Sequence, residues 1–109
     1  MTIANQITIK ADKDQTKTVK NILNTLAETA LLEKGCQKFE LYQLDKGREH
    51  FFIIEIWKSA KRYNDHLNSS AYFKLREELE PLIEEEISQA LKLTQCLTKL
   101  GLKEKKETK

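Results

Sequence analysis

The segment Phe51–Trp57 constrains the fold more than any other part of this chain, because it is apolar on both faces of an extended strand. Successive residues of a strand point to opposite faces of a sheet. One face therefore carries Phe51, Ile53 and Trp57, and the other carries Phe52, Ile54 and Ile56. A contiguous apolar patch of this kind marks a partner site. The segment predicts a central strand with helices on one face and a second sheet on the other, which favours a homodimer.

Periodicity assigns the segments before this strand. Residues 2–10 alternate between apolar and polar side chains, which predicts a half-buried strand. Residues 14–33 predict a helix, with Asp12 or Asp14 as its N-cap and Gly35 in the left-handed position after its last turn. The buried face of this helix is expected to hold Val19, Ile22, Leu23, Leu26, Ala27, Ala30 and Leu31.

The remaining elements follow from turn and cap signals. Residues 37–44 are expected to form a hairpin with the strand over residues 51–57. Ser59 is predicted to cap a helix over residues 60–67, Ser69 or Ser70 to cap another helix, and Pro81 to end it. Alternating leucines predict a last strand near residues 88–98. The order β-α-β-β-α-β defines an α+β, ferredoxin-like fold, an antiparallel sheet with helices on one face.

Composition bounds the organisation and the partners. The chain has 109 residues, 39% hydrophobic and 33% charged, which predicts one domain over residues 1–100 and a charged, disordered tail over residues 101–109. The net charge of +2 belongs to that tail, and the acidic runs at 77–80 and 84–86 would repel phosphates, so we expect no nucleic-acid partner. We expect no membrane partner and a cytoplasmic protein, because no stretch reaches the ~18 apolar residues of a membrane helix and the N-terminus lacks a signal pattern.

Metal-binding and cofactor-binding motifs are missing from the sequence. It contains no Gly-rich phosphate loop and no dinucleotide fingerprint. The two cysteines, Cys36 and Cys96, lie far apart, and the two histidines, His50 and His66, belong to different predicted elements. We therefore expect no metal site and no cofactor, and we interpret the cysteines as small, partly buried hydrophobic residues.

Three short motifs follow one another along the chain: GCQKFELY at Gly35–Tyr42, IEIWKS at Ile54–Ser59 and HLNSSAYFK at His66–Lys74. Their order and spacing resemble the antibiotic biosynthesis monooxygenase family, over roughly residues 3–97. The resemblance implies a dimeric α+β barrel built from two sheets, with a quinol monooxygenase-like activity that oxygenates an electron-rich ring without a cofactor. The implied partners are a small quinol, quinone-like or polyhydroxylated aromatic molecule, molecular oxygen and a second copy of the chain.

Two residues are the candidates for catalysis. His66 is expected to act as a base or hydrogen-bond partner, since an imidazole can accept a phenolic proton near neutral pH. The alternative is a partly exposed residue on a short helix. Asn5 lies on the apolar face of the first predicted strand, where an amide needs a partner. It is predicted to hold a substrate oxygen, or else to be satisfied by backbone or water on an edge strand.

Five aromatic side chains are candidates for the walls of a substrate site, namely Trp57, Tyr63, Tyr72, Phe73 and Phe39. Ordinary core packing is the alternative, and it is favoured for Phe39 and Phe73. Arg76 either holds an anionic group of the substrate or pairs with Glu80 one turn further along the helix. Glu55 is interpreted as an ion-pair or hydrogen-bond partner within the sheet.

Other functions stay open. A heme-degrading relative on this fold combines a strand asparagine with a tryptophan and a heme-ligating histidine; Asn5 matches, but His66 stands at the tryptophan position and Arg76 at the histidine position. A non-oxidative isomerase and a non-enzymatic barrel that binds a small ligand or responds to stress are the further alternatives. RNA-recognition domains share the topology, but their third strand needs glycine–aromatic alternation that HFFIIEIW lacks.

Overall fold

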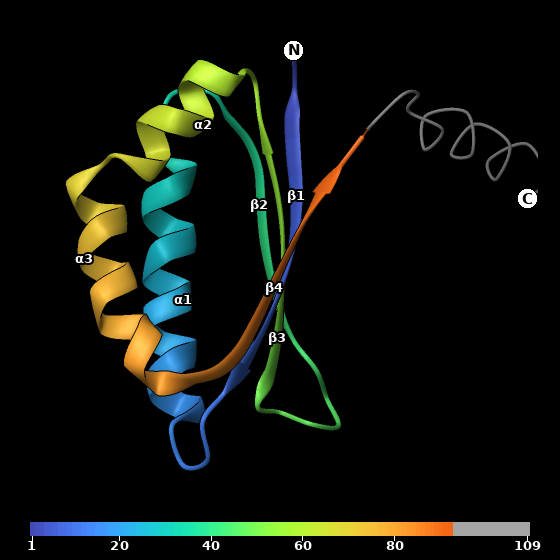
Figure 1. Cartoon of the computed structure of the whole chain (residues 1–109), viewed down its shortest axis with the longest axis vertical. Helices are drawn as coiled ribbons and strands as arrows, with labels where there is room; N and C mark the ends of the chain where they lie inside the picture. Colours follow the sequence, from blue (N-terminus) through green and yellow to red (C-terminus); the bar gives the residue numbers. More distant parts are fainter. Residues whose placement is uncertain (93–109) are drawn as a thin grey trace, which may run out of the picture.

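β3 (His50–Trp57) is an interior strand of a four-stranded antiparallel sheet, as its two apolar faces predict. The computed structural model describes residues 1–92, and the strand order is β2-β3-β1-β4. The other elements are β1 (Ile3–Ala11), α1 (Thr16–Leu31), β2 (Cys36–Gln43), α2 (Ala60–Leu67), α3 (Ser70–Leu79), the 3₁₀ turn η1 (Glu80–Leu82) and β4 (Ile83–Leu91). The three helices lie on one side of the sheet (Figure 1). The α+β, ferredoxin-like fold is confirmed.

The register of the central strands decides which side chains face the helices. Asn5 of β1 lies opposite Glu55 of β3, and Phe39 of β2 lies opposite the same glutamate from the other side. Phe51, Ile53 and Trp57 point toward the helices and are at most 1% exposed. Phe52, Ile54 and Ile56 point to the opposite face of the sheet and are only partly buried in the single chain.

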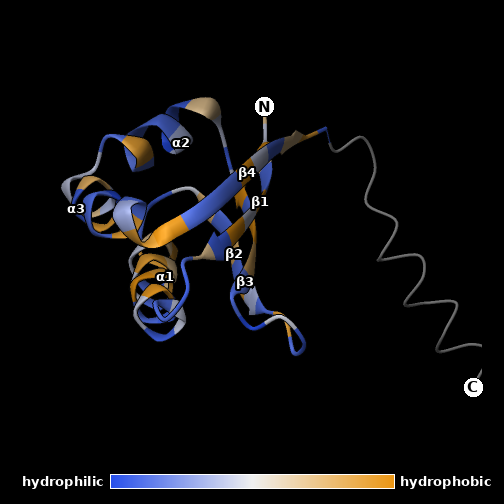
Figure 2. Ribbon diagram, turned by 60° about the horizontal axis from the view of Figure 1, so that its bottom comes forward, coloured by the Kyte–Doolittle hydropathy of each residue, from blue (hydrophilic) through white to orange (hydrophobic). Residues whose placement is uncertain are grey.

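α1 packs on the sheet through one apolar stripe. Val19, Leu23 and Ala30 are fully buried, and Figure 2 shows apolar and polar residues alternating along this helix. Leu31 was expected in the stripe, but this expectation was wrong because its side chain is 54% exposed. Each helical residue turns by about 100°, so Leu31 lies about 100° around the helix axis from Ala30 and away from the sheet.

The helix caps agree with the sequence in two cases and differ in one. The Ser59 side chain accepts a hydrogen bond from a backbone N–H at the start of α2, and Ser69 does the same for α3. Gln15 precedes α1 without a side-chain cap, so neither Asp12 nor Asp14 caps this helix. Asp14 instead adopts a left-handed backbone conformation with φ of 69° in the turn.

The last strand begins earlier than its sequence suggests. β4 starts at Ile83, directly after the turn around Pro81, because the chain enters the sheet there and pairs with β1. The expected start near residue 88 was therefore wrong. Residues 93–98 of the expected strand, Cys96 and the predicted tail over 101–109 lie outside the described residues. None of the helices in the described part is long and apolar enough to cross a membrane.

Gly35 provides a test of how α1 is joined to β2. Its φ is +85°, and a Cβ at this position would overlap the side chain of Arg62. Gly35→Ala should therefore lower the free energy of unfolding by about 1–3 kcal/mol, measured by urea denaturation. Gly47→Ala is the matched control, since Gly47 has φ of +84° but a Cβ there would meet only the His50 side chain, at 3.2 Å. Equal losses for the two variants would contradict the role of the close approach to Arg62.

Candidate functional site

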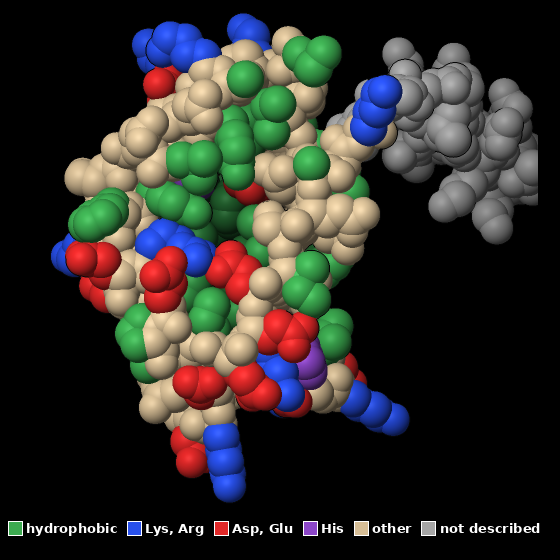
Figure 3. Space-filling model, in the orientation of Figure 1, with side chains coloured by type: hydrophobic (Ala, Val, Ile, Leu, Met, Phe, Trp, Pro, Cys, Tyr) green, Lys and Arg blue, Asp and Glu red, His purple; other side chains and the backbone are tan. Residues whose placement is uncertain are grey.

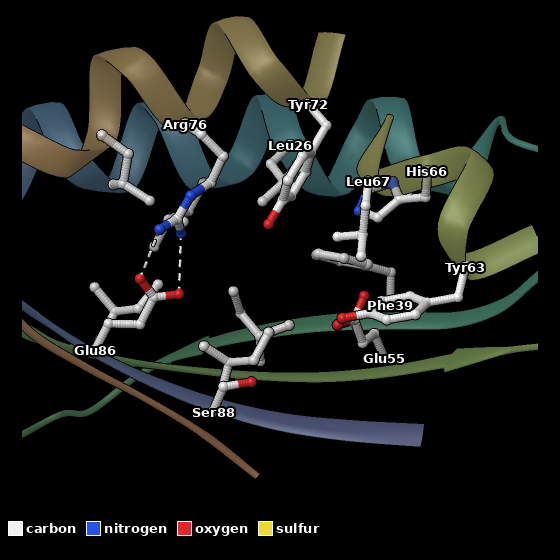
Figure 4. Close-up of a pocket in the computed structure, with 15 residues that line it drawn as sticks. Leu26, Phe39, Glu55, Tyr63, His66, Leu67, Tyr72, Arg76, Glu86 and Ser88 are labelled. Atoms are coloured by element: carbon white, nitrogen blue, oxygen red, sulfur yellow. Dashed lines mark hydrogen bonds and ion pairs between the residues drawn. The ribbon is translucent and has the colours of Figure 1, made fainter. Parts of the chain in front are cut away.

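A small, partly enclosed cavity lies between the helices and the sheet. It has a volume of about 60 Å³ and receives side chains from all three helices and from β1, β2, β3 and β4. In Figure 3 a hollow lined by apolar side chains opens between the helical layer and the sheet, with acidic and basic side chains side by side below it. Figure 4 shows Tyr72 and Arg76 reaching down from α3, and Glu86 and Ser88 reaching up from β4.

The floor of the cavity contains a buried carboxylate. Glu55 is 3% exposed and accepts two hydrogen bonds, from Asn5 Nδ2 at 3.1 Å and from Trp57 Nε1 at 2.8 Å. These donors compensate for the desolvation of the carboxylate oxygens. The interpretation of Glu55 as a hydrogen-bond partner within the sheet is confirmed. Asn5 is 7% exposed and lies on an interior strand, so it is not the edge-strand amide considered as its alternative.

His66 is the most buried ionisable side chain facing the cavity. It is 2% exposed, so it is not the partly exposed helix residue considered as an alternative. Its ring stacks on Trp57 with a centroid separation of 4.5 Å and lies 4.7 Å from the ring of Tyr72. Its Nδ1 atom lies 2.9 Å from Oε2 of Glu33, just beyond the end of α1. An ionised carboxylate only accepts hydrogen bonds, so this contact places the proton of a neutral imidazole on Nδ1.

The remaining ring nitrogen, Nε2, carries the lone pair in that tautomer. His66 itself lines the cavity. Within the described residues, no side chain hydrogen-bonds to Nε2. Every fully buried side-chain nitrogen or oxygen of these residues has a partner, so Nε2 is not fully buried. The Glu33–His66 pair therefore has the arrangement of a general base with an orienting carboxylate.

Two tyrosines contribute hydroxyl groups to the same cavity. Burial, followed by the charge of Glu55, raises the pKa of the Tyr63 hydroxyl above its usual range, although a hydrogen bond with Asn5 acts in the opposite direction. Burial also raises the pKa of Tyr72, with Arg76 opposing it and Glu86 adding to it. Both phenols therefore remain protonated at neutral pH, and each hydroxyl keeps a proton that it can donate to a ligand.

Arg76 closes the solvent side of the cavity with two carboxylates. Its guanidinium contacts both oxygens of Glu86, at 2.9 and 3.0 Å, and one oxygen of Glu80 at 2.9 Å. The pairing with Glu80 that the sequence offered as an alternative is confirmed. Burial alone would lower the pKa of Arg76, but the hydrogen bonds and charge of Glu86, together with the hydrogen bond to Glu80, raise it above its ordinary value.

The other predicted wall residues are only partly brought together. Trp57 is fully buried behind His66, and it supports that ring instead of lining the cavity. Phe73 does not belong to the site, because its side chain is 64% exposed. It follows Tyr72 by one residue, and the ~100° turn between them directs Phe73 away from the sheet.

Sequence reasoning missed Glu33 and Glu86. Glu33 lies 33 residues before its partner His66, and no local pattern joins them. Glu86 belongs to a run of three glutamates that reads as a solvated helix, whereas in β4 it lies opposite Ile9 and faces the helices. In the described part of the chain, no three His, Cys, Asp or Glu side chains converge as a metal site would require.

Several solved structures share the fold of this chain. The chain is similar to PA3566 from Pseudomonas aeruginosa, with 20% identity, a TM-score of 0.81 and coverage of 86% of this chain and 95% of that one. It is similar to Rv0793 from Mycobacterium tuberculosis, with 18% identity, a TM-score of 0.81 and coverage of 88% and 98%. A structure described as an antibiotic biosynthesis monooxygenase has 15% identity and a TM-score of 0.79, with coverage of 85% and 99%. At these identities the likeness establishes the fold.

The family is established separately. The model of the antibiotic biosynthesis monooxygenase family matches residues 2–89. The chain belongs to this family, as the order of its three motifs predicted. The comparison with curated proteins finds none that matches.

Glu55→Gln tests the hydrogen bonds at the cavity floor. A glutamine directs an NH₂ group at either Asn5 or Trp57, so one donor loses its acceptor, and the free energy of unfolding should fall by about 1–3 kcal/mol. Trp57 is the single tryptophan of the chain, so its fluorescence should change with the loss of its partner. Glu28→Gln, at an exposed position of α1, is the matched control. Unchanged stability together with unchanged Trp57 emission would show that these hydrogen bonds do not hold the floor.

Proposed function

We propose that this protein is a cofactor-independent monooxygenase that acts on a small quinol or polyhydroxylated aromatic compound. The observation that carries the proposal is His66, buried in an aromatic cavity and bound through Nδ1 to Glu33 at 2.9 Å. This contact leaves Nε2 as the base for a phenolic proton. Membership of the family supports the reaction class, and the cavity between sheet and helices supports the location.

The proposed chemistry needs no external reductant. Nε2 of His66 accepts a proton from a ring hydroxyl, and the resulting phenolate transfers an electron to molecular oxygen. One oxygen atom bonds to a ring carbon and the other leaves as water. A diol C₆H₆O₂ and O₂ thus give a hydroxyquinone C₆H₄O₃ and H₂O, and the four electrons come from the diol itself.

The other cavity residues receive supporting roles. The Tyr63 and Tyr72 hydroxyls, which stay protonated, would donate to the anion that forms on the substrate. Asn5 is already bound to Glu55, so its proposed role is to hold the floor and Tyr63 in place and not to bind substrate directly. The imidazolium that forms on His66 would be stabilised by Glu33 and by its position in the last turn of α2.

The size of the cavity limits what can enter. Its volume of about 60 Å³ is well below the roughly 300 Å³ at the lower end of ligand pockets. A single ring is therefore the proposed substrate size, and the Arg76–Glu86 pair at the solvent side would have to move to admit it. Heme is disfavoured, because Arg76 stands where the resemblance implies a heme-ligating histidine, and a guanidinium has no lone pair to donate to iron.

The outer face of the sheet supports a homodimer as part of this proposal. The helices leave Phe52, Ile54 and Ile56 on the uncovered face, and Tyr42 and Ile87 on the same face are 50% and 55% exposed. Two such faces packed together would bury apolar area worth about 25 cal/mol per Å². The proposed arrangement is one barrel formed by two sheets.

Oxygen uptake with hydroquinone or catechol, without added flavin or metal, tests the activity. His66→Ala should lower turnover by about 10²–10⁴-fold through loss of the base. Glu33→Gln should lower it by at least about tenfold, because the neutral ring is then free to place its proton on the wrong nitrogen. His50→Ala is the matched control, since His50 lies at the start of β3, away from the cavity. Uptake no faster than buffer autoxidation would favour the binding-only alternative, and an unimpaired His66→Ala would refute the assignment of the base.

The dimer is tested at the centre of the outer face. Ile54→Lys should convert the dimer into a monomer of about 12.7 kDa and lower its stability, because a lysine buried without a partner is costly. Sedimentation at micromolar concentration measures both species. Asn24→Lys adds the same charge to an exposed position of α1 and should leave the dimer intact. A monomeric wild-type protein would contradict this part of the proposal.

A further inference from the structure

The charges around the cavity are strongly unequal. Arg76 is the only lysine or arginine among the described residues that line it, whereas Glu55 and Glu86 both contribute carboxylates. Glu80 adds a third carboxylate through its contact with Arg76. Arg76 contributes one positive charge, and the carboxylates around it outnumber that charge. The cavity therefore presents a negative field to an incoming molecule.

The one guanidinium is already occupied. Glu86 binds it through two hydrogen bonds and Glu80 through a third, with side-chain exposures of 23% for Arg76 and 26% for Glu86. A bidentate pair of this kind is among the strongest side-chain interactions. A neutral ring can enter with the Arg76–Glu86 pair intact. An anionic group that bound Arg76 would have to displace Glu86, and it would leave that carboxylate, carried by β4 opposite Ile9, without its partner beside the new charge.

The same carboxylates also lie close enough to affect the two tyrosine hydroxyls of the cavity. Each hydroxyl would carry a negative charge if it ionised, and in each the surrounding carboxylates oppose that charge. Burial is the main cause that raises the pKa of Tyr72; Arg76 lowers this pKa, and Glu86, Glu55 and Glu80 each raise it. At Tyr63, deeper toward the floor, Glu55 acts in the same direction. A fixed anionic group placed beside these hydroxyls would lose hydration and would lie close to the same carboxylates.

We propose that the site admits neutral ring diols and rejects those that carry a carboxylate or another fixed anionic group, with Glu86 as the residue that sets this selectivity. The inference rests on the proposed function and narrows its substrate class. It replaces the expectation that Arg76 holds an anionic group of the substrate. It also requires the phenolic proton to remain in the site, on His66, so that the phenolate forms as an ion pair and not as an isolated charge.

Two ligands of the same shape separate charge from size. 3,4-Dihydroxybenzamide carries a neutral amide where 3,4-dihydroxybenzoate carries a carboxylate. Binding of each ligand to the full chain at neutral pH is measured by quenching of Trp57 fluorescence and by NMR titration. The benzamide should bind the wild-type protein at least about tenfold more tightly than the benzoate. Glu86→Gln should reduce this ratio toward one by strengthening benzoate binding.

Glu80→Gln is the matched control. It removes the same charge, but Glu80 makes a single contact with Arg76 and its side chain is 61% exposed, so its charge is screened and the ratio should change little. Benzoate binding that equals or exceeds benzamide binding in the wild type, or an unchanged ratio in Glu86→Gln, would overturn the inference. Selective binding without oxygen uptake would support it and refute oxygenation, whereas binding of neither ligand would overturn both.

Discussion

The carboxylate of Glu55 is the interaction around which the interior of this protein is arranged. A charged group that is 3% exposed must be surrounded by donors, and the β1–β3 register supplies Asn5 directly opposite it. The indole of Trp57 supplies the second donor, which fixes the orientation of that ring. His66 then stacks on the indole. The position of the proposed base therefore depends on the hydrogen bond between Trp57 and Glu55, which lie two residues apart on the same face of β3.

The ends of two helices complete the site. Glu33 lies just beyond the end of α1, where a carboxylate is unfavourable because it meets the negative end of the helix dipole. The contact with His66 gives that acid a partner on α2. Glu33 is unfavourable for the end of α1 but pairs with the buried imidazole of His66. Its position is therefore better explained by a role in the site than by the stability of α1. The same logic applies to Glu86, a polar residue that β4 turns toward the interior to meet Arg76.

The fold could be predicted from sequence because its main signals are local. The two apolar faces of Phe51–Trp57, the helical stripe of α1 and the caps at Ser59 and Ser69 each act within a few residues. β4 was placed too late, since its glutamates resemble a helix until the pairing with β1 is known. The site was predictable only in part: His66 and the tyrosines stood out by residue type, whereas the role of Glu33 depends on a contact across 33 residues. Phe73 shows the opposite error, because helical phase and not aromatic character decides whether a side chain reaches the cavity.

The central claim is that Glu33 sets His66 as a base with its lone pair on Nε2. Long-range ¹⁵N–¹H NMR of the histidine ring tests it most directly. The spectrum is recorded on the full chain at a pH at which the ring of His66 is neutral. The account predicts that the neutral ring carries its proton on Nδ1, and that Glu33→Gln shifts the population toward the other tautomer. A neutral ring protonated on Nε2 in the wild-type protein, or a tautomer unaffected by Glu33→Gln, would contradict it.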